Sequence, residues 1–91
     1  MIRQTVRVEN RLGLHARAAA KLVRLASRFS SDVYLCREGT DQRVDSKGIL
    51  GLLMLGAAQG TRLVVVVDGK DEAEAVEDIR RLFEERFGEE S

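Results

Sequence analysis

The chain opens with alternating polar and apolar side chains and then changes to a helical period. Residues 2–8 place Val6 and Val8 on the same side, with polar residues between them, which is typical of a half-buried β-strand. The run 10–13 ends that strand. Residues 16 to about 28 predict an amphipathic helix with an apolar face of Ala19, Leu22, Val23, Ala26 and Phe29 and a basic face of Arg17, Lys21, Arg24 and Arg28.

Shorter segments follow in the middle of the chain. Residues 32–37 and 42–44 predict two strands joined by a hairpin turn at 38–41. Residues 45–48 offer helix-capping side chains, and 49–55 predict a short helix that ends near Gly56. Apolar residues surround this helix, so they cannot all face a core.

The last third of the chain predicts one buried strand and one long helix. The β-branched run in 61–67 indicates a central strand. Residues 71 to about 87 predict a helix with Asp71 as its N-cap. Its expected inner face is Ala73, Val76, Ile79, Leu82, Phe83 and Phe87, and its expected outer face is Glu72, Asp78, Arg81 and Glu85.

This order of elements, βαββαβα, predicts an α+β fold. We expect an open-faced β-sandwich in which a four-stranded antiparallel sheet carries three helices on one face. Residues 1–88 would form a single domain, and 89–91 a short acidic tail. Such a fold is common and does not by itself define a function.

Composition narrows the class of protein. Among 91 residues, 15 Lys and Arg balance 15 Asp and Glu, so no net charge attracts the chain to nucleic acid or to an anionic membrane. Cys36 is the only cysteine, which excludes an internal disulfide and a cysteine metal cage and suits a reducing compartment. No segment has the length of a membrane span or the pattern of a signal peptide. We therefore expect a cytoplasmic protein without membrane insertion.

The single histidine, His15, is the candidate for chemistry. It lies between a glycine-containing turn and the predicted start of the first helix, where unpaired backbone N–H groups and the helix dipole favour a phosphate. A histidine is partly neutral and nucleophilic at cytosolic pH, and the guanidinium of Arg17 could stabilise charge on a transferring phosphoryl group. From these residues alone, a capping or surface histidine and a solvated arginine face remain the more common interpretations.

Two motifs resemble those of the HPr phosphocarrier family of the bacterial phosphoenolpyruvate-dependent sugar phosphotransferase system. Residues 13–17 (GLHAR) resemble the active-site motif of that family, and 47–56 (KGILGLLMLG) resemble its second signature. The likeness covers essentially the whole chain, and both motifs stand in the expected order and separation. The resemblance implies that His15 accepts a phosphoryl group on the ring nitrogen that faces the helix start.

The resemblance also implies partners. Enzyme I would phosphorylate His15, and His15 would pass the group to an enzyme IIA component, without a metal or organic cofactor on this chain. Such a protein is a phosphoryl-transfer intermediate rather than an independent catalyst, and one face serving successive partners suggests a monomer. The expected docking surface comprises Ile49, Leu50 and Leu53, flanked by the basic residues Lys21 and Arg24.

Three positions depart from the family pattern or bear on regulation. Ala18 stands where most members have proline, which leaves the helix intact but its first turn less rigid. Gly48 stands where many Gram-positive members have a regulatory serine, so that phosphorylation site is absent. Ser46 could cap the short helix or serve as a substitute acceptor, and we favour the cap.

Two other classes of function are compatible with parts of this sequence. A regulatory module would keep the fold and His15 but dock other proteins according to its phosphorylation state. A nucleic-acid binder would need stacking aromatic residues on the sheet, whereas the chain has only Tyr34 and three phenylalanines. We expect no nucleic-acid partner.

Overall fold

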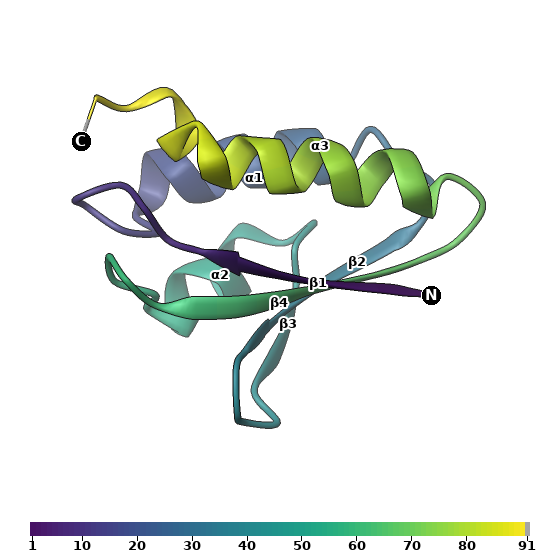
Figure 1. The fold of residues 1–91 in the computed structure, drawn as a ribbon, viewed down its shortest axis with the longest axis horizontal. Helices are drawn as coiled ribbons and strands as arrows, with labels where there is room; N and C mark the ends of the chain where they lie inside the picture. Colours follow the sequence, from purple (N-terminus) through teal and green to yellow (C-terminus); the bar gives the residue numbers. More distant parts are fainter. Residues whose placement is uncertain (91) are drawn as a thin grey trace.

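The structure is a computed structural model that describes residues 1–90. Its secondary structure follows the predicted order (Figure 1). The elements are β1 (Ile2–Arg7), α1 (Ala16–Ala26), β2 (Asp32–Arg37), β3 (Arg43–Asp45), α2 (Ile49–Leu55), β4 (Arg62–Asp68), α3 (Glu72–Glu84) and a 3₁₀ turn, η1 (Arg86–Gly88).

One four-stranded antiparallel sheet forms in the order β1-β4-β2-β3. The β-branched strand β4 is central, as predicted, and pairs with β1 from Ile2↔Val67 to Arg7↔Arg62. Leu63, Val65 and Val67 of β4 are buried, because this strand is paired on both sides and covered by helices. The short strand β3 begins at Arg43, one residue later than expected.

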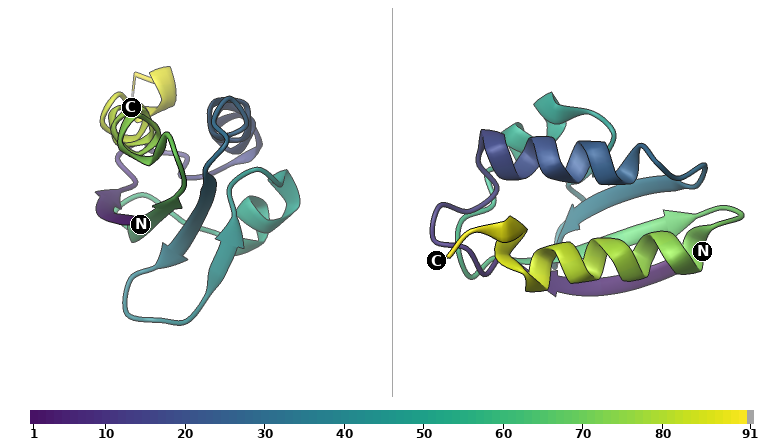
Figure 2. Two further views of the ribbon diagram at one scale, coloured as in Figure 1. Left: turned by 90° about the vertical axis from the view of Figure 1, so that its right-hand side faces the viewer. Right: turned by 90° about the horizontal axis from the view of Figure 1, so that it is seen from above.

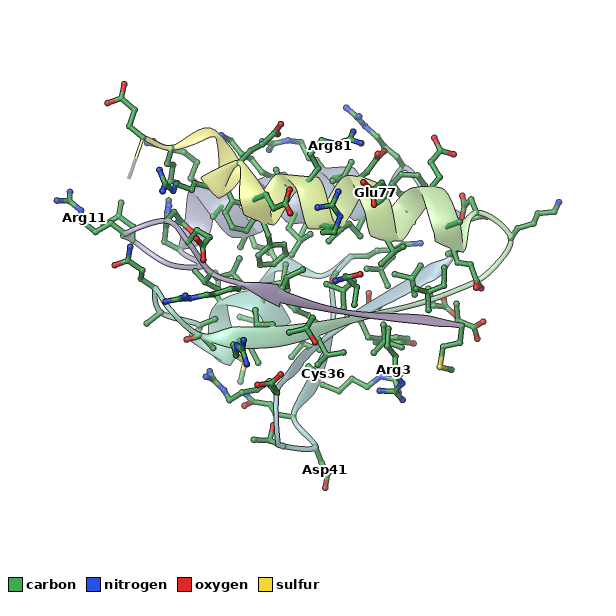
Figure 3. All side chains as sticks on the ribbon, viewed as in Figure 1. Arg3, Arg11, Cys36, Asp41, Glu77 and Arg81 are labelled. Carbon is green, nitrogen blue, oxygen red and sulfur yellow. The ribbon has the colours of Figure 1, made fainter. Side chains whose placement is uncertain are left out.

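The helices lie on one face of the sheet, which confirms the open-faced sandwich (Figure 2). Helices α1 and α3 run side by side above the strands, and α2 packs against α1 and β3. The opposite face carries Arg3 and Cys36, which point away from α1 and α3 (Figure 3). Within residues 1–90, no helix combines the length and the apolar character needed to cross a bilayer.

The last helix differs from its prediction in length and in its inner face. It ends at Glu84, and Arg86 and Phe87 both adopt φ 55°, a left-handed conformation that stops the helix. Phe87 is nevertheless buried, with its ring edge-on to Phe83 at 4.9 Å between centroids. Ala75 is buried instead of the predicted Ala73, which is exposed, because Ala75 shares the four-residue spacing of the other core positions.

Asp71 occupies the N-cap position of α3, as predicted, but its side chain does not cap the helix. Its carboxylate accepts hydrogen bonds from the backbone N–H groups of Ser30 and Ser31, at 2.9 and 3.0 Å, and from the Ser31 hydroxyl. These bonds, the one from the Ser31 hydroxyl first, lower the pKa of Asp71 to about 2. The carboxylate therefore joins the segment between α1 and β2 to the start of α3.

Candidate functional site

The loop before α1 has one conformation imposed by close packing. Gly13 adopts φ 69°, and a Cβ at this position would lie 2.6 Å from the carbonyl oxygen of Ala57. The next residue, Leu14, donates its backbone N–H to that same oxygen at 2.8 Å. The buried Asn10 side chain donates to the carbonyl of Gly13 at 2.7 Å. Only glycine fits here, and the position of the following residue is fixed as a result.

That following residue, His15, is the N-cap of α1, where the sequence placed it. Its backbone is extended (φ −79°, ψ −179°), and its carbonyl accepts the first helical hydrogen bond from Ala19. Its ring Nδ1 accepts a hydrogen bond from the backbone N–H of Arg17 at 3.3 Å. Nδ1 therefore faces the positive end of the helix dipole and presents its lone pair there.

The other ring nitrogen contacts a residue that the sequence analysis assigned only to a tail. Nε2 of His15 lies 2.6 Å from Oε2 of Glu89, and Oε1 of Glu89 accepts from Asn10 Nδ2 at 3.0 Å. Burial raises the pKa of Glu89, but hydrogen bonds from His15 and Asn10 and the nearby positive charges outweigh it, so the net pKa is lowered. The carboxylate is ionised at neutral pH.

Arg17 and Ala18 form the first turn with His15. The Arg17 side chain is exposed, and its guanidinium makes no hydrogen bond or ion pair within residues 1–90. Its donors are thus available to an anion at the helix start. Ala18, in the place of the family proline, is fully buried in the core and continues the helix.

The two basic residues expected beside a docking surface differ in their surroundings. Lys21 Nζ donates to the carbonyl oxygen of Phe87 at 2.5 Å, so this ammonium group holds the C-terminal segment against α1. Arg24 is exposed in the last turn of the helix. A docking role for either residue stays a prediction.

Helix α2 exposes an apolar surface. Ile49, Leu50 and Leu53 lie at its surface together with Met54, which the sequence analysis did not single out, and their exposed fractions run from 40% to 73%. Leu52 and Leu55 are buried and attach the helix to the core. We call the four exposed residues the α2 patch. Exposed apolar side chains that gather on one helix face often mark an interaction site.

The start of α2 contradicts the prediction for Ser46. Gly48 is the N-cap, and no side chain caps this helix. Ser46 is completely buried, and its hydroxyl has no hydrogen-bond partner within the described residues. Its backbone N–H is fixed to the Val33 carbonyl at 2.9 Å, which turns the side chain inward. The capping prediction is therefore wrong, and this burial also disfavours a role as acceptor.

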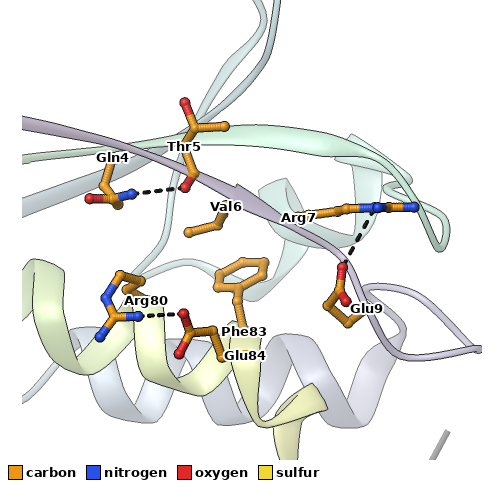
Figure 4. Close-up of a pocket in the computed structure, with 8 residues that line it drawn as sticks. All are labelled: Gln4, Thr5, Val6, Arg7, Glu9, Arg80, Phe83 and Glu84. Carbon is orange, nitrogen blue, oxygen red and sulfur yellow. Dashed lines mark hydrogen bonds and ion pairs between the residues drawn. The ribbon is translucent and has the colours of Figure 1, made fainter.

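A hollow between β1 and α3 lies apart from these residues (Figure 4). Its lining includes no residue of the predicted site, and its charged groups pair with one another, Arg80 with Glu84 and Arg7 with Glu9. It is lined by Gln4, Thr5, Val6, Arg7, Glu9, Arg80, Phe83 and Glu84. The hollow is therefore separate from the start of α1 and from His15.

Comparison with known proteins gives consistent matches over the full length. The family model described as the PTS HPr component phosphorylation site matches residues 2–85. The phosphocarrier protein HPr of Treponema pallidum is 47% identical over 90 residues, which are 99% of this chain and all of that protein.

Two solved structures extend the comparison. The crystal structure of HPr-C-His from Thermoanaerobacter tengcongensis superposes with a TM-score of 0.92 at 38% identity and covers both chains completely. Crh of Bacillus subtilis, described as a catabolite repression protein and as an intertwined dimer with a swapped domain, has a TM-score of 0.73 at 40% identity, over 94% of this chain and 97% of its own.

Proposed function

The chain belongs to the HPr family and is a phosphocarrier of the phosphotransferase system, and we propose that His15 is the residue that carries the phosphoryl group. The observation that supports this most strongly is the position of Nδ1. It lies at the N-cap of α1 and faces the backbone N–H of Arg17. A nucleophilic nitrogen and an anion-binding helix end therefore meet at one point.

The transfer needs few groups from this chain. The neutral ring attacks phosphorus through Nδ1, the new Nδ1–P bond forms, and the bond from phosphorus to its donor breaks. The first-turn N–H groups and the Arg17 guanidinium, which has no partner among residues 1–90, stabilise the charge on the phosphoryl oxygens. The chain holds the group until an acceptor reverses the step, so it acts as a carrier rather than an independent catalyst.

Intact-mass spectrometry tests the assignment of His15. Incubation with phosphoenolpyruvate and enzyme I should add one acid-labile phosphoryl group to the wild type and none to His15→Ala. Circular dichroism of the variant should match the wild type, because the ring is partly exposed and lies outside the core. An adduct on His15→Ala would overturn the assignment.

We further propose enzyme I and enzyme IIA components as the partners, docked through the α2 patch. Exposed leucine, isoleucine and methionine are typical of the apolar centre of an interface, and α2 packs against α1, the helix that begins at His15. Arg24 would border such an interface and attract acidic surfaces, which raises the rate of encounter more than the final affinity. Leu50→Asp, at an exposed position, should weaken binding to enzyme I while leaving the melting temperature unchanged, and calorimetry measures both.

A regulatory role is the second candidate, and the likeness to Crh favours it. In that case the phosphorylation state of His15 would control docking to other proteins. Gly48 provides no hydroxyl for regulation through the α2 loop. Pull-downs with phosphorylated and unphosphorylated chain should then retain different proteins, whereas a carrier alone should retain the same transport components.

We propose a monomer that works in the cytoplasm. Support for the monomer is that the three helices of the described chain pack on their own sheet and on one another. Light scattering after size exclusion should give a mass near 10.1 kDa. A mass twice that value would indicate a dimer of the kind described for Crh.

A further inference from the structure

The C-terminal segment carries a carboxylate back to His15 across 74 positions of sequence. Buried Phe87 anchors the segment in the core, and its left-handed backbone reverses the chain. Lys21 holds the carbonyl of Phe87, and the backbone N–H of Glu89 donates to the carbonyl of Arg86 at 2.9 Å. Figure 2 shows the C-terminal end beside the loop that precedes α1.

Glu89 is firmly held at the site. Its side chain is only 13% exposed, compared with 26% for the His15 ring. Each carboxylate oxygen has its own partner, since Oε2 meets His15 Nε2 and Oε1 accepts from Asn10. Asn10 is itself fully buried and bonded to the loop that positions His15. Asn10 therefore helps to position both the Glu89 carboxylate and the loop that carries His15.

The two contacts of the ring select the same tautomer. A neutral imidazole has one N–H donor and one lone pair. An ionised carboxylate only accepts, so Nε2 must carry the proton that it shares with Glu89. The backbone N–H of Arg17 only donates, so Nδ1 must present its lone pair. Glu89 and the helix start thus favour the tautomer in which Nδ1 is the nucleophile.

From this geometry we propose that Glu89 is a positioning residue for phosphoryl transfer through His15, which rests on the function proposed above. When Nδ1 bonds to phosphorus and the donor's bond to phosphorus breaks, the ring becomes positively charged, while the proton stays on Nε2. The carboxylate stabilises that charge, as acidic partners of catalytic histidines do. In the forward transfer the charge returns to zero as the Nδ1–P bond breaks. The family match ends at residue 85, before Glu89.

Glu89→Gln tests this with little change in shape. A glutamine has one oxygen, so it cannot accept from both Asn10 and His15 as the carboxylate does. We expect transfer from phosphorylated enzyme I to slow about tenfold, the difference between a charge-assisted and a neutral hydrogen bond. The ¹⁵N shifts of the His15 ring should move from the Nε2–H tautomer toward an average of the two tautomers.

Glu90→Gln is the matched control, because it removes the same charge from an exposed neighbour. It should keep both the transfer rate and the ring tautomer of the wild type. Wild-type rates and ¹⁵N shifts in Glu89→Gln, or an equal slowing in both variants, would overturn the positioning role. Failure of the wild type to accept any phosphoryl group would instead overturn the function proposed for His15.

Discussion

Helices α1 and α2 begin in different ways, although both follow loops that pack on the core. At α1, the cap is His15, whose Nδ1 binds a first-turn N–H and whose Nε2 contacts an ionised carboxylate. At α2, the cap is Gly48, and no side chain binds the helix start. Of the two cap residues, only His15 offers an atom to which phosphorus can bond. The proposed chemistry and the proposed docking surface therefore lie on neighbouring helices, which contact each other.

Arg17→Ala should have the largest effect of the changes that probe this contrast. Loss of the free guanidinium should slow phosphoryl transfer about 100-fold, in line with the loss of one strong donor to a charged transition state. Rapid-quench assays measure the rate, and calorimetry should show little change in affinity for enzyme I. Arg28→Ala, an exposed arginine just after the same helix, is the control. Equal losses of rate and affinity in Arg17→Ala would assign this residue to docking instead.

Gly13→Ala should disrupt the close packing that fixes the conformation of the loop before α1. The new Cβ would meet the Ala57 carbonyl at 2.6 Å in a left-handed conformation, so we expect a loss of about 2 kcal/mol in the free energy of unfolding. Gly39→Ala shares the positive φ but has nothing within 4 Å, and should lose about 1 kcal/mol. Urea denaturation measures both. Equal losses in the two variants would show that the close approach to Ala57 adds nothing to the loss of stability in Gly13→Ala.

Ser46→Ala probes the loop before α2. Its buried hydroxyl has no partner within residues 1–90, so its removal should raise the free energy of unfolding by about 1 kcal/mol. Ser30→Ala, at an exposed position, should change it by less than about 0.5 kcal/mol. A marked loss of stability in Ser46→Ala would mean that this hydroxyl makes a stabilising hydrogen bond.

Gly48→Ser should give α2 a side-chain cap, as α1 already has. Of the changes considered, it should have the smallest effect on stability. The backbone at Gly48 (φ −122°, ψ 121°) accepts a side chain, and a Cβ there would meet only the Asp45 carbonyl oxygen, at 3.8 Å. A serine cap should add a few tenths of a kcal/mol in thermal unfolding. Gly48→Ala, which lacks the hydroxyl, should give no gain, and equal stability of the two variants would exclude a capping bond.

Local patterns were sufficient to predict most of the fold and part of the site. Alternation, helical spacing and turn residues together predicted the four strands and three helices of residues 1–90, but not the 3₁₀ turn η1. The position of His15 as a cap followed from the turn before it and the helix after it. The exposure of Ile49, Leu50 and Leu53 followed from a short helix with apolar residues on all sides.

The features that the sequence did not reveal depend on contacts between distant segments. Glu89 lies in a polar C-terminal segment that has neither helical nor strand periodicity. Its contact with His15 requires the left-handed turn at Phe87. Ser46 resembles a capping residue by type, but the pairing of β2 with β3 turns it inward. Asp71 likewise caps by position, while its carboxylate binds the segment after α1.

The pairing of β1 with β4 also governs when this protein can fold. Strand β1 has no partner until residues 62–68 have been made, because β4 is its only neighbour in the sheet that residues 1–90 form. Closing so long a stretch of chain costs entropy before any pairing is gained, which slows folding relative to helical proteins of this size. A nascent chain should therefore stay sensitive to protease until its last third emerges, and the contact of Glu89 with His15 would be among the final ones to form.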